Sequence, residues 1–278
     1  MSGARPVRRQ PVGAQPATGE AELRKLAHTL GVQVERLDGL RSIPAADVSV
    51  LRTQIAEYLF QADKQHFAKI AALSSAVPVS VAAKLTEHAF PPLLAARTAE
   101  LIDPRKAADL VSRISDAYLA DVSAAMDPSR APQVIAQIPA ARIALVGHEL
   151  ARRSEWVVIG GFITHVTPAA LAQTVQTFTG EQLLHIGFVL DDKDRLDAVV
   201  SLLSDEQIDE LLGAAAQQGL WAECSDLLDH VEPQRLERLS ARLAVAAESV
   251  RAAFRAALAE GNLDGERYAR LAQHDTAG

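Results

Sequence analysis

Apolar positions recur about every twelve residues through the middle of the chain. From Asp103 onward, four consecutive units of this length align without gaps, and further units follow a longer stretch at residues 151–166. In these four units the fifth, eighth and twelfth positions are apolar, which places one apolar stripe along a short helix. The spacing therefore predicts a tandem array of short helices. The fifth positions hold Ala107, Leu119, Ala131, Ile143, Leu171 and Leu183.

The start of a helix is marked at most unit boundaries. A side-chain acceptor followed by proline is typical of an N-cap and the first helical position, where proline loses no hydrogen bond. Two further boundaries have capping-box spacing, Thr179 with Gln182 and Ser204 with Gln207. The acceptor-proline pairs are Asp103-Pro104, Asp127-Pro128, Thr167-Pro168 and Glu232-Pro233.

Helices this short require neighbours. Fewer than about 12 residues rarely form a stable helix alone in water, because nucleation is costly. The ninth position of three units is small: Ser123, Gly147 and Gly187. We expect these residues to let neighbouring helix backbones approach closely.

The array has expected limits. The same spacing continues upstream through residues 79–102, so we place the array at residues 67–243. Residues 1–19 are expected to form a disordered tail and residues 20–66 an N-terminal helical cap. Residues 244–278 are expected to form a C-terminal helix and a frayed tail.

Composition narrows the class of protein. The chain has 278 residues, of which 4% are aromatic, and its single cysteine, Cys224, allows neither a disulfide framework nor a cysteine-based zinc site. The N-terminus carries Arg5, Arg8 and Arg9 without the apolar run of a secretory signal, and the longest apolar run is too short to span a membrane. These features favour a cytoplasmic protein. The excess of Arg over Lys is typical of a GC-rich bacterial genome.

Charge bears on the choice of partner. The net charge is −7, and without the three tail arginines it is about −10, which repels a phosphate backbone. Nucleic acid is therefore disfavoured as the main partner.

The array resembles the N-terminal intracellular domain of MgtE-type magnesium channels, through its Asp-Pro or Ser/Thr openings and its apolar stripe. The resemblance covers roughly residues 67–243. It implies a right-handed, armadillo-like superhelix of short antiparallel helices, related to the middle segments of the flagellar switch protein FliG. The paired CBS domains and the pore of the channel do not occur in this sequence, so the resemblance implies an interaction or sensing module and not transport.

Residues 151–166 break the period and contain Gly160 and Gly161 within an apolar stretch. One interpretation is an elongated, kinked central helix that buries Trp156 and Phe162 in the core. The alternative is the wall of a ligand pocket, in which histidines would supply a metal ligand or a general base. The candidate pocket residues are His148, Trp156, Phe162, His165 and His185.

An acidic cluster lies at a predicted helix start. Carboxylates in such a group could bind Mg²⁺, although helix capping and the helix dipole also explain acids at this position. The candidate metal ligands are Asp191, Asp192, Asp194 and Asp197.

No motif in the sequence specifies a reaction. It contains no P-loop, no G-x-G-x-x-G, no G-x-S-x-G and no C-x-x-C. We therefore expect a non-enzymatic helical-repeat module that presents a curved surface to a protein partner, without a required cofactor. The alternatives are a small-molecule binder or enzyme with a pocket at residues 151–166, and a magnesium-sensing module. Self-association is left open by the sequence.

Overall fold

The computed structural model describes residues 16–75 and 77–261. Every regular element in these two ranges is a helix, and neither range contains a strand. The predicted all-α fold class is therefore confirmed. Among the same residues, no helix is both long enough and apolar enough to cross a bilayer. The tail arginines and the expected frayed tail lie outside the described residues.

The chain divides into two compact units, residues 1–54 and residues 55–278. We call them the first unit and the second unit and describe each by itself. The division falls inside helix α2 (Ala45–Ser75), whereas the sequence places the start of the array near Phe67.

The first unit contains helix α1 (Pro16–Leu30), the 3-10 helix η1 (Val34–Leu40) and the start of α2. Helix α1 begins before Glu20, so part of the stretch expected to be a tail is helical. The helix is followed by Gly31 at a φ of 65°, a backbone conformation that favours glycine after a helix end. Glu22 Oε2 on α1 lies 3.4 Å from Arg52 Nε on α2, so an ion pair joins the two helices.

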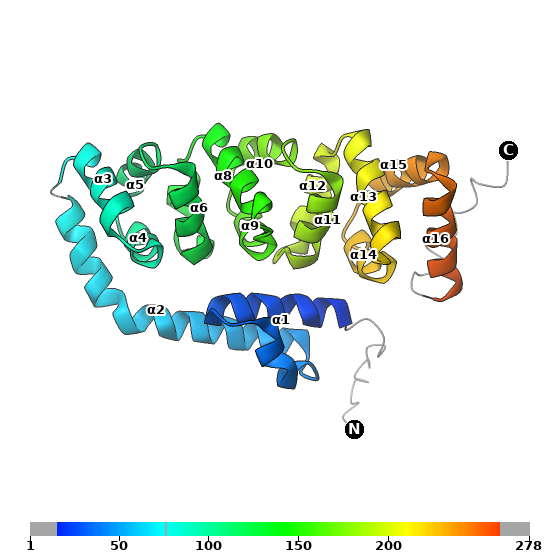
Figure 1. The fold of residues 1–278 in the computed structure, drawn as a ribbon, viewed down its shortest axis with the longest axis horizontal. Helices are drawn as coiled ribbons and strands as arrows, with labels where there is room; N and C mark the ends of the chain where they lie inside the picture. The colour runs from blue at the N-terminus through cyan, green and yellow to red at the C-terminus, as the bar shows by residue number, and fades with distance from the viewer. Residues whose placement is uncertain (1–15, 76, 262–278) are drawn as a thin grey trace, which may run out of the picture. The chain divides into compact units, whose positions relative to one another are not determined.

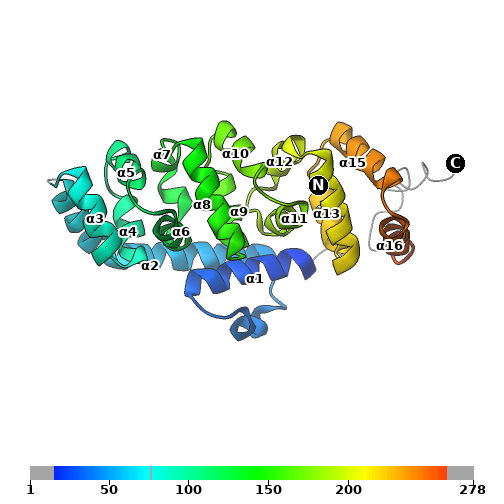
Figure 2. The ribbon, with the colours of Figure 1, turned by 45° about the horizontal axis from the view of Figure 1, so that its top comes forward.

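The second unit continues with short helices that follow one another in chain order from α3 to α16 (Figures 1 and 2). Their starts follow the predicted spacing. The helices are α3 (Val79–Ala89), α4 (Pro92–Ala99), α5 (Pro104–Val111), α6 (Asp116–Ala125), η2 (Pro128–Arg130), α7 (Pro132–Ile135), α8 (Ala140–Arg152), α9 (Trp156–Ile163), α10 (Pro168–Val175), α11 (Gly180–Val189), η3 (Lys193–Arg195), α12 (Leu196–Leu202), α13 (Asp205–Gln218), α14 (Trp221–Leu228), α15 (Pro233–Val245) and α16 (Glu248–Ala259).

Alternate helices form the main contacts of this unit. Helices α4, α6, α8, α10 and α12 contact one another in series, as do α3, α5 and α7, and also α9, α11 and α13. Most helices from α3 to α13 therefore pack on the helix two places along the chain, whereas α13 and α12 also contact α16 and α15, three places along. The right-handed superhelical geometry stays a prediction.

Most predicted N-caps are present. The carboxylate of Asp103 accepts hydrogen bonds from the backbone amides of Arg105 and Lys106, at 3.0 and 3.1 Å. Both predicted capping boxes are complete, at α11 and at α13. Glu232 occupies the N-cap position of α15, but its side chain makes no capping hydrogen bond, so the prediction of a side-chain acceptor there is wrong. The proline that follows still starts the helix.

Helix ends are also satisfied by side chains from helices two or three places away in the chain. The backbone amide of Ser115 donates to Glu87 at 3.2 Å, and that of Gly180 donates to Glu210 at 2.7 Å. The buried Gln207 Nε2 donates to two carbonyl oxygens, of Val175 at 2.8 Å and of Phe178 at 2.7 Å. These cross-repeat hydrogen bonds satisfy backbone groups that short helices leave without an internal partner.

The second half of α2 is joined to the array through Phe60. The guanidinium carbon of Arg130 lies 4.0 Å from the centre of the Phe60 ring, and that of Arg97 lies 5.8 Å from it. Arg130 also pairs with Glu57 on α2, at 2.6 Å. Cation–π contacts and one ion pair thus link α2 to α4 and η2.

The expected elongated central helix is replaced by two helices. Helix α8 runs on to Arg152, and α9 begins separately at Trp156. Between them, Ser154 has a φ of 60°, a left-handed conformation that ends α8. The period is lengthened because α8 is long and a turn follows it.

Small residues do allow close helix approach. A Cβ at Gly147 would lie 2.9 Å from Thr174 Cγ2 on α10, and a Cβ at Gly187 would lie 3.1 Å from Leu227 Cδ1 on α14. The closest approach to backbone atoms is at Gly180, which is not one of the ninth-position residues. A Cβ at Gly180 would overlap the carbonyl oxygen of Gln207 and lie 2.5 Å from the backbone nitrogen of Leu211.

We expect Gly180→Ala to destabilise the protein by about 3 kcal/mol, because α11 and α13 must separate to make room for a methyl group against backbone atoms. Gly213→Ala is the matched control, since a Cβ at Gly213 would meet nothing within 4 Å. That change should stabilise α13 by about 0.5 kcal/mol. Urea unfolding measures both; equal midpoints for the two variants would contradict the close approach at Gly180.

Candidate functional site: an apolar cavity

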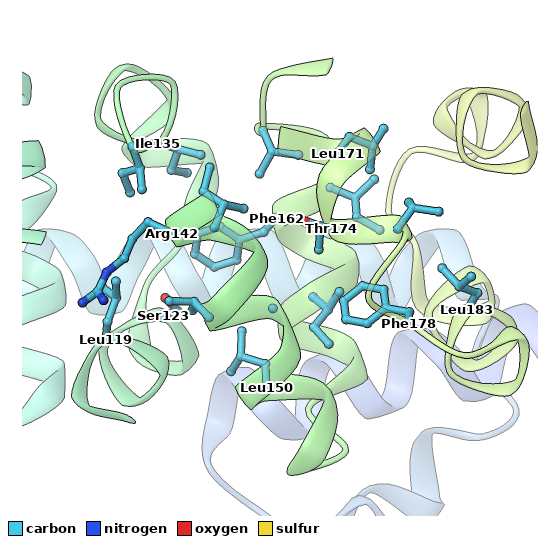
Figure 3. A pocket seen from close by; sticks show the side chains of 18 residues that line it. Leu119, Ser123, Ile135, Arg142, Leu150, Phe162, Leu171, Thr174, Phe178 and Leu183 are labelled. Carbon is cyan, nitrogen blue, oxygen red and sulfur yellow. The ribbon is translucent and has the colours of Figure 1, made fainter. Parts of the chain in front are cut away.

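Helices α6 to α11 surround a hollow in the core of the second unit (Figure 3). Its free space is about 80 Å³, and its lining is almost entirely aliphatic and aromatic. Most of the side chains that face it are buried, so the hollow lies within the helical array and not on a flat surface. We call it the central hollow. The residues labelled in Figure 3 are Leu119, Ser123, Ile135, Arg142, Leu150, Phe162, Leu171, Thr174, Phe178 and Leu183.

A second hollow lies toward the start of the same unit and has a free space of about 100 Å³. It is lined by residues from α3 to α7 together with Phe162 from α9, and we call it the leading hollow. The two hollows adjoin, because they have lining residues in common. The shared residues are Leu119, Ser123, Ile135, Ile138 and Phe162.

Arg142 and Thr174, which face the central hollow, have polar partners, although the buried Nε of Arg142 accounts for none of these contacts and has no hydrogen-bond partner among the described residues. Arg142 forms an ion pair with Asp116 and donates to the carbonyl oxygen of Ile114. Thr174 Oγ1 donates to the carbonyl oxygen of Ala170 at 2.7 Å. The central hollow therefore offers apolar contact and shape, and its one arginine is neutralised by a carboxylate.

Small side chains help to leave this space unfilled. Ser123 and Gly147, two of the small ninth-position residues, both line the central hollow. The same small side chains that let helices approach also leave this space incompletely filled.

The structure brings together only some of the predicted pocket residues. Trp156 on α9 stacks on His185 of α11, with ring centres 5.7 Å apart, and Phe188 packs on the edge of His185 at 6.5 Å. This aromatic cluster does not line either hollow, whereas Phe162 lines both. Neither hollow therefore contains all five residues, and a shared pocket for them stays a prediction.

The other two histidines lie apart from these features. His148 is exposed on α8 and contacts neither hollow. His165 is half-buried just after α9, and burial lowers its pKa. Glu149 forms ion pairs with Arg152 and Arg153, both at 2.8 Å, and hydrogen bonds from these arginines lower its pKa to about 2. It is a paired acid and not a poised general base.

The acidic cluster is used in several structural ways. Asp192 caps η3, accepting from the backbone amide of Asp194 at 3.1 Å. Asp197 accepts from the backbone amide of Glu232 at 3.0 Å and pairs with Arg235. Asp191 and Asp194 are exposed. Within residues 16–75 and 77–261, no three His, Cys, Asp or Glu side chains are grouped so as to hold a metal ion.

Comparison with known proteins gives no match: no family model, no curated protein and no solved structure matches this chain. The fold and the cavity together define an all-α protein with a helical array and an apolar interior space. The resemblance to the MgtE-type domain stays a prediction.

The only cysteine in the sequence should be unreactive in the folded protein. Cys224 on α14 is buried, and burial raises the pKa of its thiol to about 12. A thiol reagent at neutral pH should therefore label the native protein at least a hundredfold more slowly than protein unfolded in guanidinium. Comparable rates in the two conditions would contradict the burial of this side chain.

His165 should make stability depend on pH. Because its pKa is lowered mainly by burial, the folded state disfavours the charged imidazole. Its contribution is present above the unfolded-state pKa of about 6.5 and is lost as the pH falls through the lower folded-state value. His165→Gln should therefore reduce the loss of stability between about pH 7 and pH 5.

The control for this measurement is His148→Gln, which removes an exposed imidazole from the neighbouring helix. Thermal unfolding of both variants and of the original protein should be followed across the same pH range. A profile for His165→Gln that superimposes on that of the original protein would contradict a burial effect on this histidine.

Proposed function

We propose that this protein is a non-enzymatic helical-repeat module that binds a protein partner through the first helices of its array. The observation that carries the proposal is a set of exposed apolar side chains on α3 and α4. Val81 and Leu85 on α3 are 53% and 50% exposed, and Leu93 on α4 is 54% exposed. We call these three residues the leading apolar surface.

The position of this surface favours a partner. Val81 and Leu85 are four residues apart and so lie on one side of α3. Terminal repeats usually have a polar outer face, because solvent replaces the missing neighbour. Large apolar side chains exposed together mark interaction sites. By contrast, Leu145 and Val245 are exposed singly, on α8 and α15.

The arrangement of reactive groups supports a binding role over catalysis. The cysteine thiol has a raised pKa, and Glu149 is held in ion pairs. The histidines at positions 148, 165 and 185 lie on different parts of the second unit and outside the apolar cavity. The expected resemblance to an intracellular interaction domain agrees with this role.

A second candidate function is the binding of an apolar small molecule. The specific observation in its favour is the pair of adjoining hollows, since ligand sites are typically apolar with few polar groups. Helix α9 lies within the irregular stretch 151–166 and lines both hollows, which agrees with the interpretation of that stretch as the wall of a pocket. The histidines have no part in it.

The leading apolar surface can be tested with the double variant Val81→Glu and Leu93→Glu. Neither residue lines a hollow, so the cavity is left intact. Two buried carboxylates at an interface should weaken partner binding by at least about tenfold. Affinity capture from the native cytoplasm, with quantitative mass spectrometry, compares the partner recovered by the original and variant proteins.

The matched control is Val245→Glu, because Val245 is 71% exposed and lies on α15. Circular dichroism should show that all three proteins are folded. A partner lost from the double variant and retained by the control supports the proposal. Equal recovery of that partner by the double variant would overturn it.

A further inference from the structure

The free space inside the second unit is elongated along the array. The leading hollow is lined mainly by α3 to α7, and the central hollow mainly by α6 to α11. They meet at the side chains of Leu119, Ile138 and Phe162, which face both. A ligand that enters both hollows must therefore extend past Phe162.

The size of each hollow selects a narrow ligand. Pockets for drug-sized molecules are about 300–1,000 Å³, whereas these hollows have about 80 and about 100 Å³ of free space. A dry cavity of about 150 Å³ lined by Leu, Ile and Phe accepts a molecule of the size of benzene. Each hollow can therefore enclose only a narrow group smaller than benzene, and a chain of eleven carbon atoms would leave part of its length outside the two hollows.

The chemistry of the lining selects an uncharged, saturated group. Aliphatic side chains and phenylalanine dominate both hollows. The charge of Arg142 is balanced by Asp116, and its guanidinium also donates to the carbonyl oxygen of Ile114. A charged group placed deep in this space would lose its hydration without gaining an opposite charge.

From these three features we infer that the cavity binds a linear hydrocarbon chain, such as the acyl chain of a lipid or fatty acid. The chain occupies the leading and central hollows in series and passes Phe162. This inference rests on the second candidate function, the binding of an apolar small molecule. It shares Leu85 with the leading apolar surface but does not involve Val81 or Leu93.

The first experiment compares two alcohols with the same number of carbon atoms, linear 1-undecanol and the compact cage 1-adamantanemethanol. Each is added to the full chain below its aggregation concentration, and Tm is measured with the binding heat. Undecanol should raise Tm by about 5 °C near saturation, since a ligand that binds only the folded state stabilises it. Adamantanemethanol should leave Tm unchanged. Equal effects of the two alcohols would overturn the linear-chain inference.

Undecanoate tests whether the protein recognises the hydrocarbon chain or the head group of the ligand. A chain recognised by its hydrocarbon part binds as the alcohol and as the carboxylate, within about tenfold. Binding of undecanoate alone would place recognition in the head group and overturn the inference.

Two variants locate the chain. Ser123→Leu fills the place where the hollows meet and should weaken undecanol binding by at least about tenfold; Ser249→Leu, on the exposed side of α16, is the matched control. Phe162→Ala widens the junction and should allow adamantanemethanol to bind. A misfolded variant would not gain this binding. If undecanol binds all of these proteins equally and adamantanemethanol binds none, the cavity is not the site.

The tests of the two functions give separable results. The double variant Val81→Glu and Leu93→Glu should bind undecanol as the original protein does, because neither side chain faces a hollow. Loss of the protein partner with retained undecanol binding leaves both proposals standing. A protein with no detectable undecanol binding removes the hydrocarbon site and leaves the partner surface to its own test.

Discussion

The second unit depends on contacts between alternate helices. Helices such as α5, α9 and α10 have eight residues each, too few to persist alone in water. Their ends expose backbone groups that a longer helix would satisfy internally. Glu87, Glu210 and Gln207 supply those partners from helices two or three places away in the chain. The same contacts between helices therefore bury the apolar side chains and supply hydrogen-bond partners for the helix ends. Removing one helix would leave backbone groups at the ends of its neighbours without partners.

Charged side chains reinforce the same contacts at the surface. Arg238 and Arg242 on α15 pair with Asp205 and Asp209 on α13, and Arg153 after α8 pairs with Asp121 on α6. These groups are exposed or half-buried, so each pair contributes little alone, about 0–1 kcal/mol. Their repetition along the array orients the helices, while the buried apolar side chains supply most of the stability.

Close approach and free space have a common origin in the small residues. Gly147 brings α8 against α10 and also faces the central hollow, and Ser123 on α6 faces the same hollow. A larger residue at Gly147 would fill the space at the expense of helix contact. The proposed hydrocarbon site and the packing of the array therefore use the same positions. Of the leading apolar surface, Leu85 lines the leading hollow, whereas Val81 and Leu93 line neither hollow.

The sequence by itself determined the helical class, the starts of most helices and the caps at Asp103, Thr179 and Ser204, because these depend on residues close together in the chain. It also indicated close approach at Gly147 and Gly187. It did not determine that His148 is exposed while Trp156 stacks on His185, nor that Phe162 lines two hollows. Such juxtapositions depend on the rotation of each helix about its axis and on the turn at Ser154. Only packing between helices distant in sequence decided them.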